Sequence, residues 1–252
     1  FRRVLFRSAL RIFTGAPMPP GADCVLVQEE AARDGDRLSL AGDGPDGPDG
    51  NMRAKGSDFH AGDALIVAGQ RLTPARLALA AVAGHGVLAV RRRVRVALLS
   101  TGDELVLPGV AVKPGQLPSS NATMLAALLG ALGCEVADLG IVHDDLGALG
   151  VAIDGARDFD LLITTGGASV GDRDLVRPAL IAAGATIDFW KVALRPGKPL
   201  MAGRQGDQMI LGLPGNPVSA LVTARLFAVP LVRAMMGDAA PVDPLRQATL
   251  TV

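Results

Sequence analysis

The pattern of hydrophobic and polar positions changes near residue 94. From there on, short apolar runs alternate with longer stretches at helical spacing. The strand-like runs cover residues 94–99, 135–142, 161–165, 186–192 and 209–213. The helix-like stretches cover residues 120–132, 146–156, 174–183 and 218–236. This alternation predicts a mostly parallel three-layer α/β domain, with helices on both faces of the sheet.

The first third of the chain has a different pattern. Short β-type runs at 24–28 and 64–67 flank a loop at 41–50 that is rich in Gly, Pro and Asp. These signals predict a small β-rich module over residues 9–60. Thr73 and Pro74 predict the start of a helix over 73–83, as N-cap and first helical residue. We interpret residues 77–90 as a buried helix followed by a strand.

The two ends of the sequence stand apart from these elements. Residues 1–8 (FRRVLFRS) fit no element, and a common sequencing adapter encodes residues 2–8 in frame. We therefore predict that residues 1–8 are an assembly artefact and leave them out of the fold. Residues 247–252 have the pattern of a further strand that begins there.

Composition narrows the class of protein. Lys plus Arg equals Asp plus Glu, so the net charge is zero, which argues against a nucleic-acid partner. We find no segment long and apolar enough to span a bilayer, and expect no membrane partner. Cys24 and Cys134 lie outside any metal-ligand spacing, which favours buried thiols in a reduced, cytoplasmic protein.

Candidate chemistry follows each predicted strand. In parallel α/β sheets, ligands bind beyond the carboxyl ends of the strands. The segments at these ends are 100–105, 143–145, 166–174, 194–199 and 214–217, and each carries acid, base, glycine or proline. Five such segments at one edge of a sheet predict an active site.

Two of these groups suit an anionic substrate and a metal ion. Small residues in 166–171 can bring backbone N–H groups to a phosphate or oxyanion, or they can simply form a tight turn: Gly166, Gly167, Ser169 and Gly171. Three carboxylates can hold Mg²⁺, although each alone can be a helix cap or a solvated charge: Glu104, Asp144 and Asp174.

Two further groups follow the last strands. Three cations can neutralise phosphate or bind an oxyanion, or lie on a cationic surface loop: Lys191, Arg195 and Lys198. Pro214 and Pro217 bound a rigid turn that opens the last helix. His143 lies near the predicted site, and a catalytic role for it is the less favoured interpretation.

The motifs in these segments resemble those of a known family. The matching stretches are 11–17 (RIFTGAP), 100–105 (STGDEL), 161–171 (LLITTGGASVG), 189–199 (FWKVALRPGKP) and 212–219 (GLPGNPVS). In order and spacing they resemble molybdopterin molybdenumtransferases, an enzyme that also forms the C-terminal part of gephyrin. The resemblance runs from about residue 9 to the end of the chain.

The resemblance implies a domain organisation. A β-rich domain would cover residues 9–60, an elongated linker domain 61–93, and a molybdopterin-binding α/β domain 94–238. A C-terminal β-barrel domain would begin within 245–252. It also implies a chain truncated at both ends and a homodimer in the full-length protein, with the site between the α/β domain of one subunit and the β-rich domain of the other.

The resemblance also implies a reaction. Molybdenum from molybdate is inserted into adenylylated molybdopterin in a Mg²⁺-dependent step that releases AMP. The functional residues would be the acidic Glu104, Asp144 and Asp174, the cationic Lys191 and Arg195, the pocket-forming Pro214 and Pro217, and Thr14 and Asp58 from the β-rich domain. Arg195 stands where many relatives have Lys, and Ser57 stands where an acid is common, which weakens the assignment of Asp58.

Two other functions remain open. One is a molybdopterin adenylyltransferase, a sister enzyme and possible partner that shares the α/β domain but lacks the RIFTGAP module. The other is a non-catalytic scaffold of the gephyrin kind, which need not keep three carboxylates and a basic loop. The truncated chain itself is expected to bind ligand without turning over.

Overall fold

A computed structural model describes residues 8–167 and 175–244. Residues 1–7, 168–174 and 245–252 lie outside the described part, and with them the predicted artefact up to residue 7, the predicted final strand, and Ser169, Gly171 and Asp174. The chain forms two compact units, Phe1–Leu65 and Ile66–Val252. Each unit is treated separately below.

The first unit contains a β-hairpin followed by turns. Strands β1 (Ala31–Asp34) and β2 (Arg37–Leu40) pair antiparallel, and the 3₁₀ turn η1 (Gln28–Glu30) precedes them. The predicted strand at 24–28 is wrong. Val25 bonds through its N–H and C=O to Gly50 and Asn51, which makes an isolated link to a loop rather than a ladder. The loop at 41–50 is largely exposed, as predicted.

The second unit begins with a short helix, α1 (Pro74–Val82). The Thr73 side chain accepts the Arg76 N–H, so the predicted cap and the proline at the helix start are confirmed. The predicted strand at 64–67 is absent from the described residues of this region. The interpretation of 77–90 as a buried helix followed by a strand is also wrong, because Leu77 and Val82 of α1 are 49% and 73% exposed and residues 83–90 form no strand.

A six-stranded sheet organises the rest of this unit, in the order β6-β3-β7-β10-β9-β8. Its strands are β3 (Arg95–Thr101), β6 (Glu135–Val142), β7 (Leu161–Thr165), β8 (Thr186–Trp190), β9 (Met201–Gln205) and β10 (Gln208–Leu213). All the strands except β9 run in the same direction. The predicted mostly parallel sheet is confirmed.

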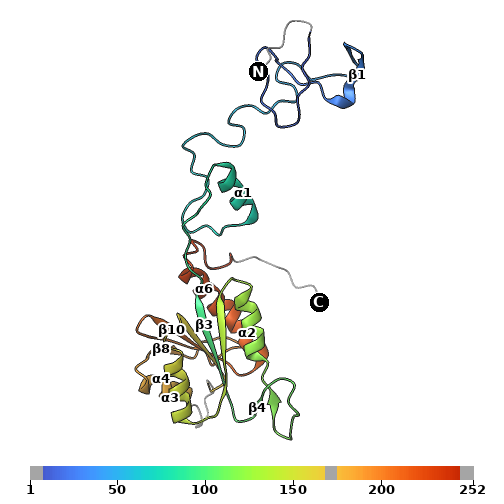
Figure 1. Cartoon of the computed structure of the whole chain (residues 1–252). Helices are drawn as coiled ribbons and strands as arrows, with labels where there is room; N and C mark the ends of the chain where they lie inside the picture. Colours follow the sequence, from blue (N-terminus) through green and yellow to red (C-terminus); the bar gives the residue numbers. More distant parts are fainter. Residues whose placement is uncertain (1–7, 168–174, 245–252) are drawn as a thin grey trace. The chain divides into compact units, whose positions relative to one another are not determined.

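Helices cover both faces of this sheet (Figure 1). They are α2 (Asn121–Gly130), α3 (Leu146–Gly155), α4 (Val176–Ala182) and a last helix built from α5 (Pro217–Thr223), the π-helical segment η2 (Ala224–Ala228) and α6 (Val229–Met235). Val96 and Leu98 of β3 pack with α2 and the last helix, whereas Ala97 and Leu99 pack with α3 and α4. This alternation buries both faces of one strand.

Strand β9 was missed by the sequence prediction. It pairs antiparallel with β10 across the two-residue turn Gly206-Asp207, and with β8 on its other side. Gly203 is required within β9, because a Cβ atom there would lie 2.4 Å from the Thr186 carbonyl oxygen. Gly203 and Arg204 interrupt the apolar run of β9, so the hydrophobic pattern does not predict this strand. The dipeptide Gly206-Asp207 is nevertheless typical of a two-residue hairpin turn. A two-stranded parallel ladder, β4 (Leu105–Val106) with β5 (Leu117–Pro118), lies outside the main sheet.

The last helix corrects the sequence expectation on membrane spans. From Pro217 to Met235 it has 19 residues and a mean hydropathy of 1.6, enough by length and composition to cross a bilayer. Core helices pass the same test, and its side chains at four-residue spacing are fully buried against the sheet: Ala220, Ala224, Ala228 and Val232. Packing against the sheet accounts for this buried stripe, whereas Val218, Leu221 and Leu226 on the same helix are exposed.

Candidate functional site

The sheet topology places a switch point between β3 and β7. The chain leaves β3 towards β6 on one side, whereas it leaves β7 towards β8 on the other. Adjacent strand ends whose connections diverge form a topological switch point, where open α/β sheets bind ligands. Residues 102–104 and 166–167 follow these two strands, so the switch point falls on two predicted segments.

Glycines allow the two strand ends to approach closely. A Cβ atom on Gly166 would lie 2.2 Å from the Thr101 carbonyl oxygen, and one on Gly167 would lie 2.4 Å from Val176. Both glycines have positive φ, 88° and 59°. The tight-turn interpretation therefore accounts for these two glycines, and any role in cradling an anion is additional.

Carboxylates join the β3 end to the β6 end. The Thr101 hydroxyl donates to Asp144 Oδ1 at 2.6 Å, and Asp144 is half-buried. The Asp103 carboxylate lies 3.1 Å from His143 Nδ1 and accepts the Asp144 N–H at 3.3 Å. Thr101 and Asp103 are residues that the sequence prediction missed, although both flank Glu104 in the same segment. The next residue, Asp145, caps α3.

Glu104 is exposed beside these groups. A Cβ atom on Gly102 would lie 2.8 Å from the Glu104 carboxylate oxygens, so glycine leaves that carboxylate its space. The Glu104 backbone carbonyl accepts the Leu117 N–H at 2.7 Å, which ties this segment to β5. Within residues 8–167 and 175–244, no three acidic, His or Cys side chains gather as a ready metal site. The third predicted ligand, Asp174, lies outside those ranges.

The β10 end forms the predicted rigid turn. The Asn216 side chain accepts the Ser219 N–H and caps α5, with Pro217 at the helix start. Pro214 is buried and Pro217 exposed. Buried Asn121, which the sequence prediction missed, donates to the Gly215 carbonyl oxygen at 2.8 Å and so connects this turn to the start of α2.

The β8 end carries the predicted cations on a tight hairpin. The Lys191 N–H donates to Leu200 O, and the Val192 N–H donates to Lys198 O, at 2.8 and 3.0 Å. The three cations are exposed, and none forms an ion pair with a described carboxylate: Lys191, Arg195 and Lys198. Since β8 runs parallel to β10 and β7, these cations lie at the same edge of the sheet as the carboxylates.

Two predicted residues belong to the first unit. Thr14 is exposed in a turn closed by the Ala16 N–H on Phe13 O. Asp58 is exposed and forms an ion pair with Arg53 at 2.5 Å. Their assignment to the site stays a prediction.

The two cysteines have no catalytic setting. Both are free thiols. Burial raises the pKa of Cys134 to about 11, and burial together with Asp23 raises the pKa of Cys24. Both thiols therefore stay protonated at neutral pH, where a nucleophilic role would need the thiolate.

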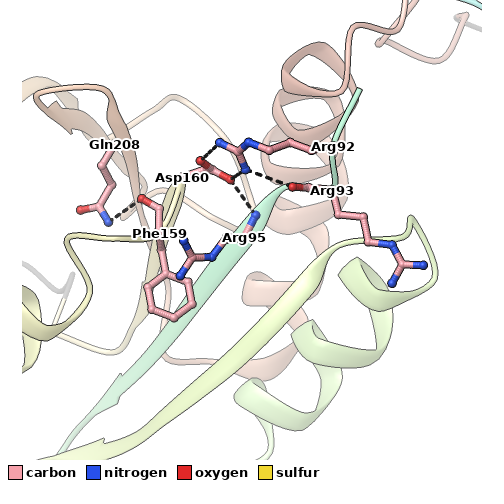
Figure 2. Close-up of polar contacts among 6 residues, drawn as sticks. All are labelled: Arg92, Arg93, Arg95, Phe159, Asp160 and Gln208. Atoms are coloured by element: carbon pink, nitrogen blue, oxygen red, sulfur yellow. Dashed lines mark hydrogen bonds and ion pairs between the residues drawn. The ribbon is translucent and has the colours of Figure 1, made fainter. Parts of the chain in front are cut away.

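The opposite, amino edge of the sheet carries a different polar cluster (Figure 2). Both terminal nitrogens of Arg92 donate to Asp160 at 2.6 Å, and the Arg95 N–H donates to the same carboxylate at 2.8 Å. These contacts, Arg92 first, lower the pKa of Asp160 against the opposing effect of burial. A pocket at this edge is lined by Arg91, Arg92, Arg93, Val94, Asp160 and Met235. Asp160 is already paired with Arg92, so we assign this pair a structural role; Arg91 and Arg93 are exposed and have no ion pair in the described residues.

Fold and candidate site together define a class of protein: an open, mostly parallel α/β domain with carboxylates at the switch point between β3 and β7 and cations at the end of β8. Residues 97–234 match the family described as "Probable molybdopterin binding domain", and residues 2–84 match "MoeA N-terminal region (domain I and II)". The chain belongs to the molybdopterin molybdenumtransferase family.

Individual relatives agree with this assignment. The chain is 40% identical to a molybdopterin molybdenumtransferase of Haemophilus influenzae over 92% of its own length and 57% of the relative. It is 41% identical to molybdopterin molybdenumtransferase 2 of Mycobacterium tuberculosis, over 97% of the chain and 61% of the relative. A crystal structure of a molybdopterin biosynthesis MoeA protein from Pyrococcus horikosii superposes with a TM-score of 0.70 at 32% identity, covering 89% of this chain and 56% of that one. The chain thus spans about three fifths of the length of these curated relatives.

Proposed function

We propose that this chain provides the pterin-binding and anion-binding part of a molybdopterin molybdenumtransferase. The reaction consumes adenylylated molybdopterin and molybdate: the phosphoanhydride is cleaved, molybdenum enters the dithiolene, and AMP and molybdenum cofactor leave. The similarity to molybdopterin molybdenumtransferases supports this proposal, together with one observation of geometry. Carboxylates lie at the switch point between β3 and β7, and cations without a described carboxylate partner follow β8 at the same, carboxyl edge of the sheet.

The charges of the substrates explain why both signs are needed. A phosphoanhydride and molybdate are both anions, and cations are needed to offset their repulsion and to stabilise charge that develops on phosphoryl oxygens. Lys191, Arg195 and Lys198 supply such cations, with no described carboxylate to compete for them.

The carboxylates at this edge are of the ligand type that Mg²⁺ prefers, although the described residues hold no preformed metal site. Magnesium sites for phosphate substrates commonly use one or two carboxylates, with water and phosphate completing the shell. Asp144 and Glu104 are the described carboxylates that we assign to it, and Asp174 is the third assigned residue. When bound, Mg²⁺ would neutralise phosphate charge, while Thr101 orients Asp144.

The remaining assignments extend the proposal beyond the α/β domain. Gly166, Gly167, Ser169 and Gly171 contact phosphate, and Pro214 and Pro217 shape the pocket floor. Thr14 and Asp58 act from the β-rich domain of the second subunit of a cytoplasmic homodimer. An adenylyltransferase that makes the adenylylated substrate is the proposed partner.

The decisive assay measures which bond is cleaved. In a chain extended to the length of its relatives, we expect AMP release from adenylylated molybdopterin on addition of molybdate. Pyrophosphate release from ATP and molybdopterin would instead show an adenylyltransferase. Release of neither product would leave a binding scaffold as the function.

A variant series tests the residues. Asp174→Asn is expected to abolish molybdate-dependent AMP release without loss of folding, and wild-type turnover would remove the role of this residue. Lys191→Ala is expected to weaken molybdate binding, and unchanged affinity would count against it.

A further inference from the structure

Two cations meet on one aromatic ring at the cationic end of the sheet. Trp190 is the last residue of β8. Lys191 Nζ lies 3.9 Å from the centroid of its indole ring, and the Arg177 guanidinium carbon lies 4.8 Å from it. Arg177 stands in the first turn of α4, so the ring joins the end of β8 to the helix that follows β7.

The backbone keeps Lys191 in a constrained conformation. Its φ is 80°, a left-handed value that non-glycine residues rarely adopt. The Lys191 N–H donates to Leu200 O, so the hairpin fixes this conformation. Strained residues that the surroundings hold in place concentrate at functional sites. Here the constraint accompanies the placement of the ammonium group over the ring.

The cluster carries more positive charge and more donors than its protein neighbours satisfy. In the described part of the chain, neither Lys191 nor Arg177 has a carboxylate partner. Arg177 Nε and Trp190 Nε1 are both buried without a hydrogen-bond acceptor. Two like charges near one ring repel each other, and an anion bound beside them offsets that repulsion.

We propose that Arg177 and Lys191 form a two-cation site for a tetrahedral oxyanion, with Trp190 as the positioning residue that holds both cations. This deepens the proposed function and rests on it, because it names Arg177 as a second binding cation beside Lys191. The indole attracts each cation through its π face. The ring thereby keeps both of them at the strand end without neutralising either.

The chain offers a direct optical probe of this site. Trp190 is its single tryptophan, so the fluorescence of the 252-residue chain reports on this cluster alone. Titration with molybdate, and separately with inorganic phosphate, is expected to give a saturable change. Arg177→Met and Lys191→Met are each expected to weaken the apparent Kd about tenfold. Calorimetric titration covers the variants that lack the indole.

Ring variants separate positioning from folding. Trp190→Phe keeps an aromatic face and is expected to retain affinity within about threefold, whereas Trp190→Leu is expected to lose about tenfold. In the Arg177→Met/Lys191→Met background, Trp190→Leu should have no further effect on Kd. Melting curves check that each variant folds.

Arg95→Met is the matched control. The Arg95 guanidinium also lies over an aromatic ring, 5.2 Å from the centroid of Phe159, but at the amino edge of the sheet (Figure 2). Its anion affinity should equal that of the wild type. Loss of affinity in Lys191→Met but not in Arg177→Met or Trp190→Leu would overturn the two-cation site and leave the proposed function standing. Absence of saturable binding by the wild type would overturn the site as well, and the AMP-release assay would then judge the proposed function on its own.

Discussion

The two edges of the sheet use the same kinds of side chain in opposite ways. At the amino edge, Arg92 is paired with Asp160 by two hydrogen bonds, and Gln208 donates to the Phe159 carbonyl oxygen (Figure 2). At the carboxyl edge, Arg177 and Lys191 share a ring and have no described carboxylate partner. The Arg92–Asp160 pair stabilises the fold, whereas Arg177 and Lys191 keep charge that a ligand can neutralise; Arg91 and Arg93 of the amino edge are exposed and likewise have no described ion pair.

The difference has a geometric origin. At the amino edge, residues 92–95 and Asp160 lie where the adjacent parallel strands β3 and β7 begin. The register of these two strands brings the residues together. At the carboxyl edge the connections after β3 and β7 leave in opposite directions, so neither connection covers the end of the neighbouring strand. Exposed arginines are present at the amino edge as well, but the ends of β3 and β7 diverge only at the second edge. Variants at the two edges should separate activity from stability.

The largest effect is expected from the carboxyl edge. Asp144→Asn should lower kcat/KM for molybdate-dependent AMP release by about 100-fold, because it removes a charge at the switch point. The Thr101 hydroxyl can still donate to the asparagine oxygen. Folding should therefore be preserved. The measurement is steady-state kinetics in a chain extended to the length of its relatives, with the melting temperature recorded in parallel.

The control for this variant lies at the amino edge. Asp160→Asn removes the same charge by the same substitution, and kcat/KM at a temperature where both variants are folded should remain that of the wild type. Equal losses of kcat/KM in the two variants would contradict the proposed difference between the edges, because both losses would then be due to impaired folding.

The hydrophobic pattern predicted most strands of the main sheet, but the sequence could not predict which residues meet at the strand ends. The ranges 135–142 and 161–165 match β6 and β7 to the residue. The fully buried β7 is the continuous run of buried residues expected of a central parallel strand, whereas β6 ends the sheet and includes the exposed Glu135 and Asp138. The contact between Gly166 and Thr101 depends on strand order, which a single strand does not encode. The place of Arg177 beside Trp190 likewise arises only when α4 packs near β8.

A smaller effect is expected from Asp160→Asn on stability. The carboxylate side chain is 20% exposed and accepts from Arg92 and from the Arg95 backbone N–H. Loss of these charge-assisted hydrogen bonds should lower the free energy of unfolding by about 1–2 kcal/mol. Urea denaturation at pH 7 measures this. An unchanged midpoint would show that the ion pair contributes nothing net to stability.

The smallest effect is the dependence of that stability difference on pH. Arg92 and the Arg95 N–H hold the pKa of Asp160 below its ordinary value of 3.8. A carboxyl group whose pKa is lower in the folded than in the unfolded protein stabilises the fold at pH values above the unfolded-state pKa. This stabilisation is lost as the pH falls through the folded-state pKa. The stability gap between wild type and Asp160→Asn should therefore be constant from pH 7 to about pH 5 and shrink below about pH 4. Denaturation of both proteins across this range tests the sign. A gap that widened on acidification would mean that the folded protein favours the neutral carboxyl, and the amino edge would then not be the electrostatically satisfied edge of the sheet.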